Sequence, residues 1–262
     1  MRLSSVFAMS LASVVLWACA QAPAPSSSTA PELGGNVSQG ARIHTELAAL
    51  YFTRGQHAVA LRELRIALAD DSRHAPAYNM LGLVHTELRE FAEAEANFRR
   101  AIELVPNYSE GHNNFGFFLC QRGRHDEGLR HLDAALKNPL YASPEIALAN
   151  AALCAMEKGD LARAEEYLQR AFARAPDQAI ALRVAAEVHL QRGRVQDART
   201  ALMNLVRSGE LDAAALWLGV RIERKLGDRA AEASFGAQLR RRFPNAPQTK
   251  LLMNEIYEGD GR

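Results

Sequence analysis

Apolar and small residues recur along this chain with two superimposed periods. Within stretches such as "APAYNMLGLVHTEL" and "FAEAEANFRRAIEL", apolar positions fall three or four residues apart, which is the spacing of one face of an α-helix. On a longer scale the same arrangement returns every 34 residues, as between Gly82 and Gly116. The pattern therefore predicts short helices in pairs, with the pair repeated in tandem.

Each residue type in the repeat has a physical reason for its place. Numbered from Ala75 as position 1, a unit carries small residues at positions 8 and 20, which let its two helices approach closely, and apolar residues at positions 7 and 24, which fill the core. Position 15 is the turn between the helices, where Gly tolerates a positive φ; the second unit departs from this, with Arg89. Four units carry glycine there: Gly55, Gly123, Gly159 and Gly193.

This is the pattern of the tetratricopeptide (TPR) repeat. It predicts an all-α fold, a right-handed TPR solenoid of about six helix–turn–helix repeats over residues 41–257. The last unit of a solenoid must have its apolar end covered. We expect a short terminal helix in "PQTKLLMNEIYE" to do this, with Leu251, Leu252 and Ile256 as its packing residues.

The N-terminus has the features of an export signal. Residues 1–18, "MRLSSVFAMSLASVVLWA", combine one positive charge with a short apolar run and small residues, which is typical of a secretory signal peptide. A short membrane anchor is the alternative. The stretch "LWAC" resembles the bacterial lipobox, which implies acylation of Cys19 and, with Ala20 next, sorting to the outer membrane. Residues 19–40 are interpreted as the lipidated cysteine and a flexible Ala/Pro/Ser tether.

Composition and motifs argue against several functions. The chain has 31 basic and 30 acidic residues, so its charge gives no case for binding nucleic acid or anionic lipid. Sequences of the types HExxH and GxSxG and a Gly-rich phosphate loop are absent, and the eight histidines do not take metal-ligand spacing. We therefore predict a protein that is not an enzyme and has no catalytic residues, metal, cofactor or small-molecule substrate.

Two cysteines remain besides Cys19. Cys120 and Cys154 occupy positions 12 and 10 of the first helices of adjacent repeats. In a reducing compartment they would be buried apolar residues, but in an exported chain disulfides persist. We predict a Cys120–Cys154 disulfide.

The first helices of stacked repeats should line a concave groove. Apolar side chains and amides there suit an extended peptide, although the apolar members could simply pack and the asparagines could be ordinary surface. We assign partner binding to the first three repeats, through Phe52, Asn79, Leu83, Asn113 and Phe117. The same reasoning places further residues in the groove: Thr86, Glu87, Gln121, Ile146, Leu153 and Arg183.

The segments "NNFGFFLCQRGRHDEGLRHLDAALKNPLYASP" and "LGVRIERKLGD" and the cysteine pair resemble the PilF/PilW family of type IV pilus biogenesis lipoproteins. The resemblance implies a pilotin: an outer-membrane lipoprotein, anchored on the periplasmic face, that binds the pilus secretin and promotes its localisation and multimerisation. It also implies that the early repeats make that contact. The alternatives are a periplasmic TPR lipoprotein adaptor for cell-wall enzymes or outer-membrane assembly machinery, and an enzyme accessory subunit without chemistry of its own.

Overall fold

The protein forms an arch of paired helices, seen here in a computed structural model that describes residues 38–209 and 211–257. Within those residues every regular element is a helix, as the repeat pattern predicts. The helices are α1 Gln39–Thr53, α2 His57–Asp70, α3 Ala75–Glu87, α4 Phe91–Leu104, α5 Ser109–Gln121, α6 His125–Ala135, α7 Pro144–Glu157, α8 Leu161–Phe172, α9 Ala179–Gln191, α10 Val195–Ser208, α11 Ala213–Leu226, α12 Arg229–Arg242 and α13 Pro247–Met253.

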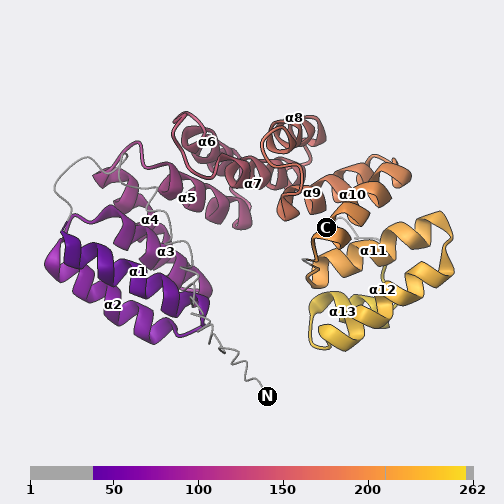
Figure 1. Ribbon diagram of the computed structural model, residues 1–262, viewed down its shortest axis with the longest axis horizontal. Helices are drawn as coiled ribbons and strands as arrows, with labels where there is room; N and C mark the ends of the chain where they lie inside the picture. Colours follow the sequence, from indigo (N-terminus) through magenta and orange to yellow (C-terminus); the bar gives the residue numbers. More distant parts are fainter. Residues whose placement is uncertain (1–37, 210, 258–262) are drawn as a thin grey trace, which may run out of the picture.

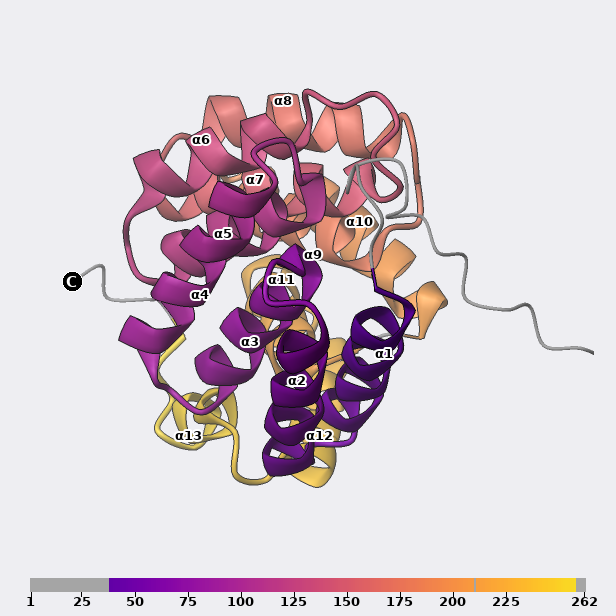
Figure 2. The same cartoon turned by 90° about the vertical axis from the view of Figure 1, so that its left-hand side faces the viewer.

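Six helix pairs, α1–α2 to α11–α12, stack in chain order, and α13 follows the last pair. Each odd-numbered helix packs most extensively against the even-numbered helix that follows it, and also against the next odd-numbered helix. The odd-numbered helices line the inner side of the arch and the even-numbered ones its outer side (Figures 1 and 2). The TPR solenoid expected from the sequence is therefore confirmed.

Close helix contact explains the small residues at positions 8 and 20. A Cβ atom added at Gly116 in α5 would lie 2.8 Å from the carbonyl oxygen of Gly128 in α6. At Gly82 the same atom would lie 2.6 Å from the ring of Phe98, and at Gly219 it would lie 2.8 Å from the ring of Phe235. Of these three glycines, Gly116 is the one whose added Cβ would meet backbone atoms, in the unit where glycine stands at both positions.

The turns between paired helices use left-handed backbone. The four glycines at position 15 have φ between 70° and 88°, so the reason given for them is confirmed. Arg89, at the same position of the second unit, also adopts a positive φ of 62°. The repeat geometry therefore imposes this conformation even on a residue that disfavours it.

The first helix begins earlier than the sequence indicates. Residues 39 and 40, placed in the tether, are the first turn of α1. The Ala41 N–H donates to the Asp70 carboxylate at 2.8 Å, and Gly40 leaves room for it, because a Cβ there would lie 2.5 Å from Asp70 Oδ2. The N-cap residue Ser38 also accepts from the Ala41 N–H, at 3.4 Å, but the shorter bond comes from the far end of α2, which local sequence does not reveal. The signal peptide and Cys19 lie outside the described residues.

The C-terminal end is covered by α13 and by the residue that ends the described chain. Leu251 and Leu252 pack against the main core, as predicted. Ile256 does not, since it is 46% exposed; the backbone reverses at Glu255, with φ of 56°, after the helix has ended. Tyr257 takes that place and stacks on Trp217 with 5.8 Å between ring centroids.

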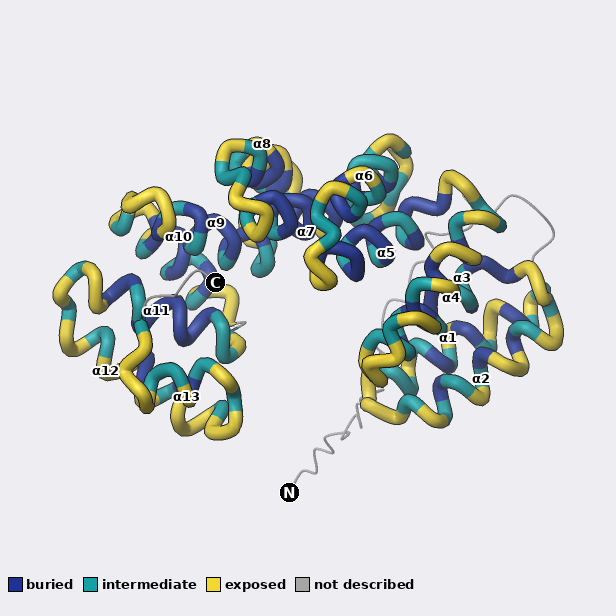
Figure 3. Tube along the Cα trace, turned by 180° about the vertical axis from the view of Figure 1, so that it is seen from behind, coloured by how far each residue is buried: buried dark blue, intermediate teal, exposed yellow. Residues whose placement is uncertain are grey.

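Buried residues run as a band through the middle of the arch (Figure 3). Alanine, leucine and valine make up most of the largest core cluster, which extends from α5 to α12. Among the described residues, none of the helices has the length and the apolar content needed to cross a membrane.

Candidate protein-binding surfaces

The two cysteines hold the third and fourth repeats together. The structure joins Cys120 of α5 to Cys154 of α7 in a disulfide, with 5.5 Å between their Cα atoms, and both residues are buried. Gly128 of α6 lies directly beside the Cys120 sulfur, where a side chain would clash. Glycine at position 20 of this unit therefore makes room for the disulfide as well as for α5.

Asparagines connect the inner helices of repeats two to four in one hydrogen-bonded ladder. The Asn150 amide donates to Asn113 Oδ1 at 3.0 Å, and the Asn113 amide donates to Asn114 Oδ1 at 3.1 Å. The Asn114 amide in turn donates to Asn79 Oδ1 at 3.2 Å. The side-chain oxygens of Asn79, Asn113 and Asn114 therefore each accept a hydrogen bond from a neighbouring amide.

This ladder changes the role of the two asparagines assigned to partner binding. Asn79 is 3% exposed and Asn113 is 5% exposed, so neither offers a free amide in the groove. Both occupy position 5 of their units, and at this position the side chain faces the neighbouring inner helix instead of the concave side. Asn114, one residue later, is less buried. The sequence did contain a signal for the ladder, because asparagine recurs at corresponding positions of neighbouring units.

The three apolar residues assigned to the groove are half-buried. Leu83 packs against two core clusters, one shared by the first and second units and one shared by the second and third, and Phe117 occupies the corresponding position 9 of the next unit. Phe52 packs on the first-unit cluster and meets the edge of His57, with 5.7 Å between ring centroids. Leu83 and Phe117 thus share one register on neighbouring inner helices, while Phe52 lies near the end of α1.

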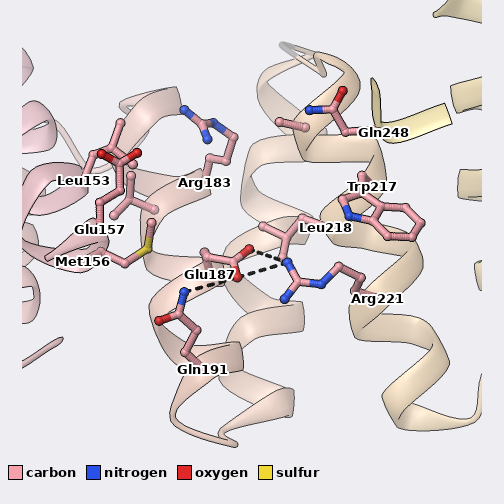
Figure 4. A pocket seen from close by; sticks show the side chains of 12 residues that line it. Leu153, Met156, Glu157, Arg183, Glu187, Gln191, Trp217, Leu218, Arg221 and Gln248 are labelled. Carbon is pink, nitrogen blue, oxygen red and sulfur yellow. Dashed lines mark hydrogen bonds and ion pairs between the residues drawn. The ribbon is translucent and has the colours of Figure 1, made fainter. Parts of the chain in front are cut away.

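A pocket opens farther along the inner side, among α7, α9, α11 and α13 (Figure 4). Its volume is about 290 Å³, and Leu153 and Arg183, two residues that the sequence places in the groove, line it. The pocket belongs to repeats four to six rather than to the first three. Its other apolar lining comes from Met156, Val184, Ala214, Trp217 and Leu218.

The charged residues of the pocket differ in how they are paired. Arg221 holds the Glu187 carboxylate with two contacts of 2.8 and 3.0 Å, drawn as dashed lines in Figure 4. Arg183 has no carboxylate within 4.0 Å among the described residues. Glu157 lies on the facing helix α7, where burial raises the pKa of its carboxyl while Arg183 and His125 oppose the rise.

No helix of the described residues covers the apolar end of the first repeat. Positions 3 and 10 of its inner helix hold Ile43 and Leu50, which are 44% and 54% exposed. In units two to five the preceding repeat covers both positions, and every residue there is buried. Those residues are Ala77, Val84, Gly111, Phe118, Ala147, Cys154, Ala181 and Val188.

Titratable groups elsewhere have a structural role. The Nδ1 atoms of His112 and His131 lie 2.9 Å apart, and His112 Nε2 donates to the Pro106 carbonyl. Burial, together with the charges of His112 and Arg130, lowers the pKa of His131 to about 4. In the described part of the chain, no group of three or more His, Cys, Asp or Glu residues is arranged to hold a metal ion.

Comparison with known proteins agrees with this architecture. The tetratricopeptide repeat family matches residues 45–109, 119–179, 150–207 and 183–247. Over 204 residues the chain is 28% identical to the type IV pilus assembly protein PilF of Pseudomonas aeruginosa (strain PAO1), which covers 78% of this chain and 81% of that protein.

Two solved structures extend the comparison to the fold. PilW, a widely conserved type IV pilus biogenesis factor, matches with a TM-score of 0.73 and 30% identity over 82% of this chain and 99% of that one. PilF of Pseudomonas aeruginosa matches with a TM-score of 0.70 and 25% identity over 83% and 98%. The chain therefore belongs to the tetratricopeptide repeat family and, within it, to the PilF/PilW family of type IV pilus biogenesis proteins.

Proposed function

We propose that this protein is a pilotin, an outer-membrane lipoprotein that binds the pilus secretin and promotes its localisation and multimerisation. Its relatives PilF and PilW are type IV pilus proteins, which supports a role in that machinery. The observation that carries the binding role is the uncovered end of the first repeat, defined by Ile43 and Leu50.

The apolar residues of this end are unusual for a terminal repeat. The outer face of a terminal repeat is normally polar, because no further repeat covers it. Here Ile43 and Leu50 lie seven residues apart, two helical turns along one face of α1, and about half of each side chain is exposed. Full burial of such a side chain contributes about 1.5–3 kcal/mol, so covering the exposed half would contribute about 1 kcal/mol for each.

The stacking inside the chain indicates what would fit on this end. In units two to five these positions are covered by helices of the preceding repeat. We therefore expect a helical segment of the secretin to pack on α1 as an additional repeat would. Leu83 and Phe117, on the next two inner helices, are proposed to extend the same contact into the groove.

A lipid anchor at Cys19 would hold this end near the membrane. Cys19 precedes Ser38 by 19 residues, a length that spans at most about 65 Å when fully extended. Several acyl chains give stable anchoring where one gives only reversible attachment. Metabolic labelling with a clickable fatty acid should mark the wild-type protein and leave Cys19→Ala unmarked; equal labelling of both would exclude the anchor.

The binding role is tested by removing the apolar end without touching the core. Ile43→Asp with Leu50→Asp places charges on exposed positions, so the protein should fold and reach normal levels. Met253→Asp is the matched control, since Met253 is 71% exposed at the opposite end of the arch. From solubilised envelopes, the double variant should recover much less secretin than wild type, and the control should recover as much. Undiminished recovery by the double variant would exclude this surface.

A further inference from the structure

The pocket among α7, α9, α11 and α13 has the size of a site for peptide side chains. Its volume of about 290 Å³ lies just below the range of about 300–1,000 Å³ typical of small-molecule sites. The helices that line it lie on the inner side of the arch (Figure 1), where an extended segment can run across successive helices. A segment that places one or two side chains in the pocket fits better than a whole cofactor.

The pocket offers apolar contact that can adapt to its occupant. Trp217 and Leu218 are nearly buried, so they form a fixed wall on α11. Leu153 and Met156 are half-buried on the facing α7, and methionine fits irregular shapes because its side chain is unbranched and flexible. An apolar side chain of a bound segment would lie between these two walls.

The charged residues of the pocket indicate which charge a bound segment should carry. Glu187 and Arg221 neutralise each other through their two contacts. Arg183 is half-buried and has no carboxylate within 4.0 Å among the described residues; Glu157 acts on it only from a greater distance, so its guanidinium group has no ion-pair partner there. A guanidinium group binds a carboxylate through two parallel hydrogen bonds more strongly than it binds a neutral group. An Asp or Glu side chain complements it.

We propose that this pocket is a second docking site, which binds an extended segment of a partner protein that carries an Asp or Glu next to a bulky apolar residue. The carboxylate pairs with Arg183, and the apolar side chain packs against Trp217 and Leu153. Glu157, on the facing helix, repels a second acidic residue and so limits the segment to one. This site is in repeats four to six, so it is independent of the contact proposed for Ile43 and Leu50.

Trp217 makes the site directly measurable. The chain has two tryptophans, Trp17 and Trp217, so a full chain with Trp17→Phe reports on the pocket by its remaining tryptophan fluorescence. The probes are the peptides enriched when a phage-displayed library of random 12-residue sequences is panned against this protein. Their affinities are then compared for three further changes: Arg183→Gln, Glu157→Gln and, as a matched control, the exposed Arg174→Gln.

Substitutions at the two charged positions should change the peptide affinity in opposite directions. Enriched peptides should pair Asp or Glu with Leu, Met or Phe and should change Trp217 fluorescence. Arg183→Gln should weaken binding by about tenfold or more, because it removes a charge-assisted contact, whereas Glu157→Gln should strengthen it and Arg174→Gln should leave it unchanged. The proposal is overturned if no peptide is enriched, if enriched peptides lack acidic residues, or if Arg183→Gln binds them as well as wild type.

Discussion

Replacing Gly116 by alanine should destabilise the protein although alanine is the better helix former. The new Cβ atom would lie 2.8 Å from the Gly128 carbonyl oxygen and 3.0 Å from the Leu132 backbone nitrogen. Both atoms belong to the backbone of α6, so rotation of a side chain cannot relieve the clash. The two helices of the third repeat would have to move apart.

A second glycine isolates the size of this effect. Gly236 also lies inside a helix, but a Cβ there would be 3.4 Å from the Leu252 side chain, which is an ordinary contact. Both substitutions gain about 1 kcal/mol of helix propensity, so that contribution cancels in the comparison. Overpacking costs about 1–3 kcal/mol, and this range is therefore the expected difference between Gly116→Ala and Gly236→Ala.

Urea unfolding followed by circular dichroism at 222 nm, without reductant, measures that difference. Gly236→Ala should be as stable as wild type or up to about 1 kcal/mol more stable. Gly116→Ala should unfold at a lower urea midpoint, with the same slope of the unfolding free energy against urea concentration. An unchanged slope matters because repeat arrays can unfold in parts, and the slope would then change. Equal midpoints for the two variants, or a higher one for Gly116→Ala, would refute the close-approach explanation of position 8.

Three further predictions concern the disulfide, the asparagine ladder and the histidine pair. Thiol titration of the unfolded, unreduced protein should find Cys120 and Cys154 unreactive, and two reactive thiols besides the anchor would exclude the disulfide. Reduction of the disulfide should lower the free energy of unfolding by roughly 3–4 kcal/mol, because it closes a loop of 34 residues. Asn113→Ala should cost about 1–3 kcal/mol in a urea titration because its neighbours lose their partners, whereas wild-type stability would show that the ladder contributes little. Because the pKa of His131 is lowered to about 4 in the folded protein, its stabilising effect should be complete above about pH 6.5 and be lost as the pH falls towards 4. His131→Phe should flatten that part of the stability profile, and an unchanged profile would assign the acid sensitivity to other groups.

The architecture was predictable because each repeat position has a local cause. Six units carried the same small and apolar positions, so a helix pair, its turn and its packing could be inferred together. The turn glycines illustrate this, since a positive φ at position 15 follows from the turn alone. The start of α1 was less predictable, because the shorter of the two bonds that cap it comes from Asp70, at the end of the next helix, in addition to the local N-cap Ser38.

The binding surfaces were less predictable because they depend on the rotation of each helix. A difference of one residue separates Asn113, which is buried in the ladder, from Asn114 beside it, and the repeat period does not fix that rotation. The exposed end at Ile43 and Leu50 becomes apparent only when the burial of equivalent positions is compared between units. Arg183 could be placed in the groove from its position, but whether any described carboxylate comes within ion-pair distance of it depends on side-chain geometry.

Photo-crosslinking in living cells tests most directly the claim that the first repeat contacts the secretin. A photoreactive amino acid at Leu50 should give a crosslinked product that contains the secretin subunit, because this residue lies in the proposed contact. The same amino acid at Met253, which is exposed at the other end of the arch, should give none. Secretin products from position 253 and not from position 50, or none from position 50 while pili assemble normally, would contradict the account.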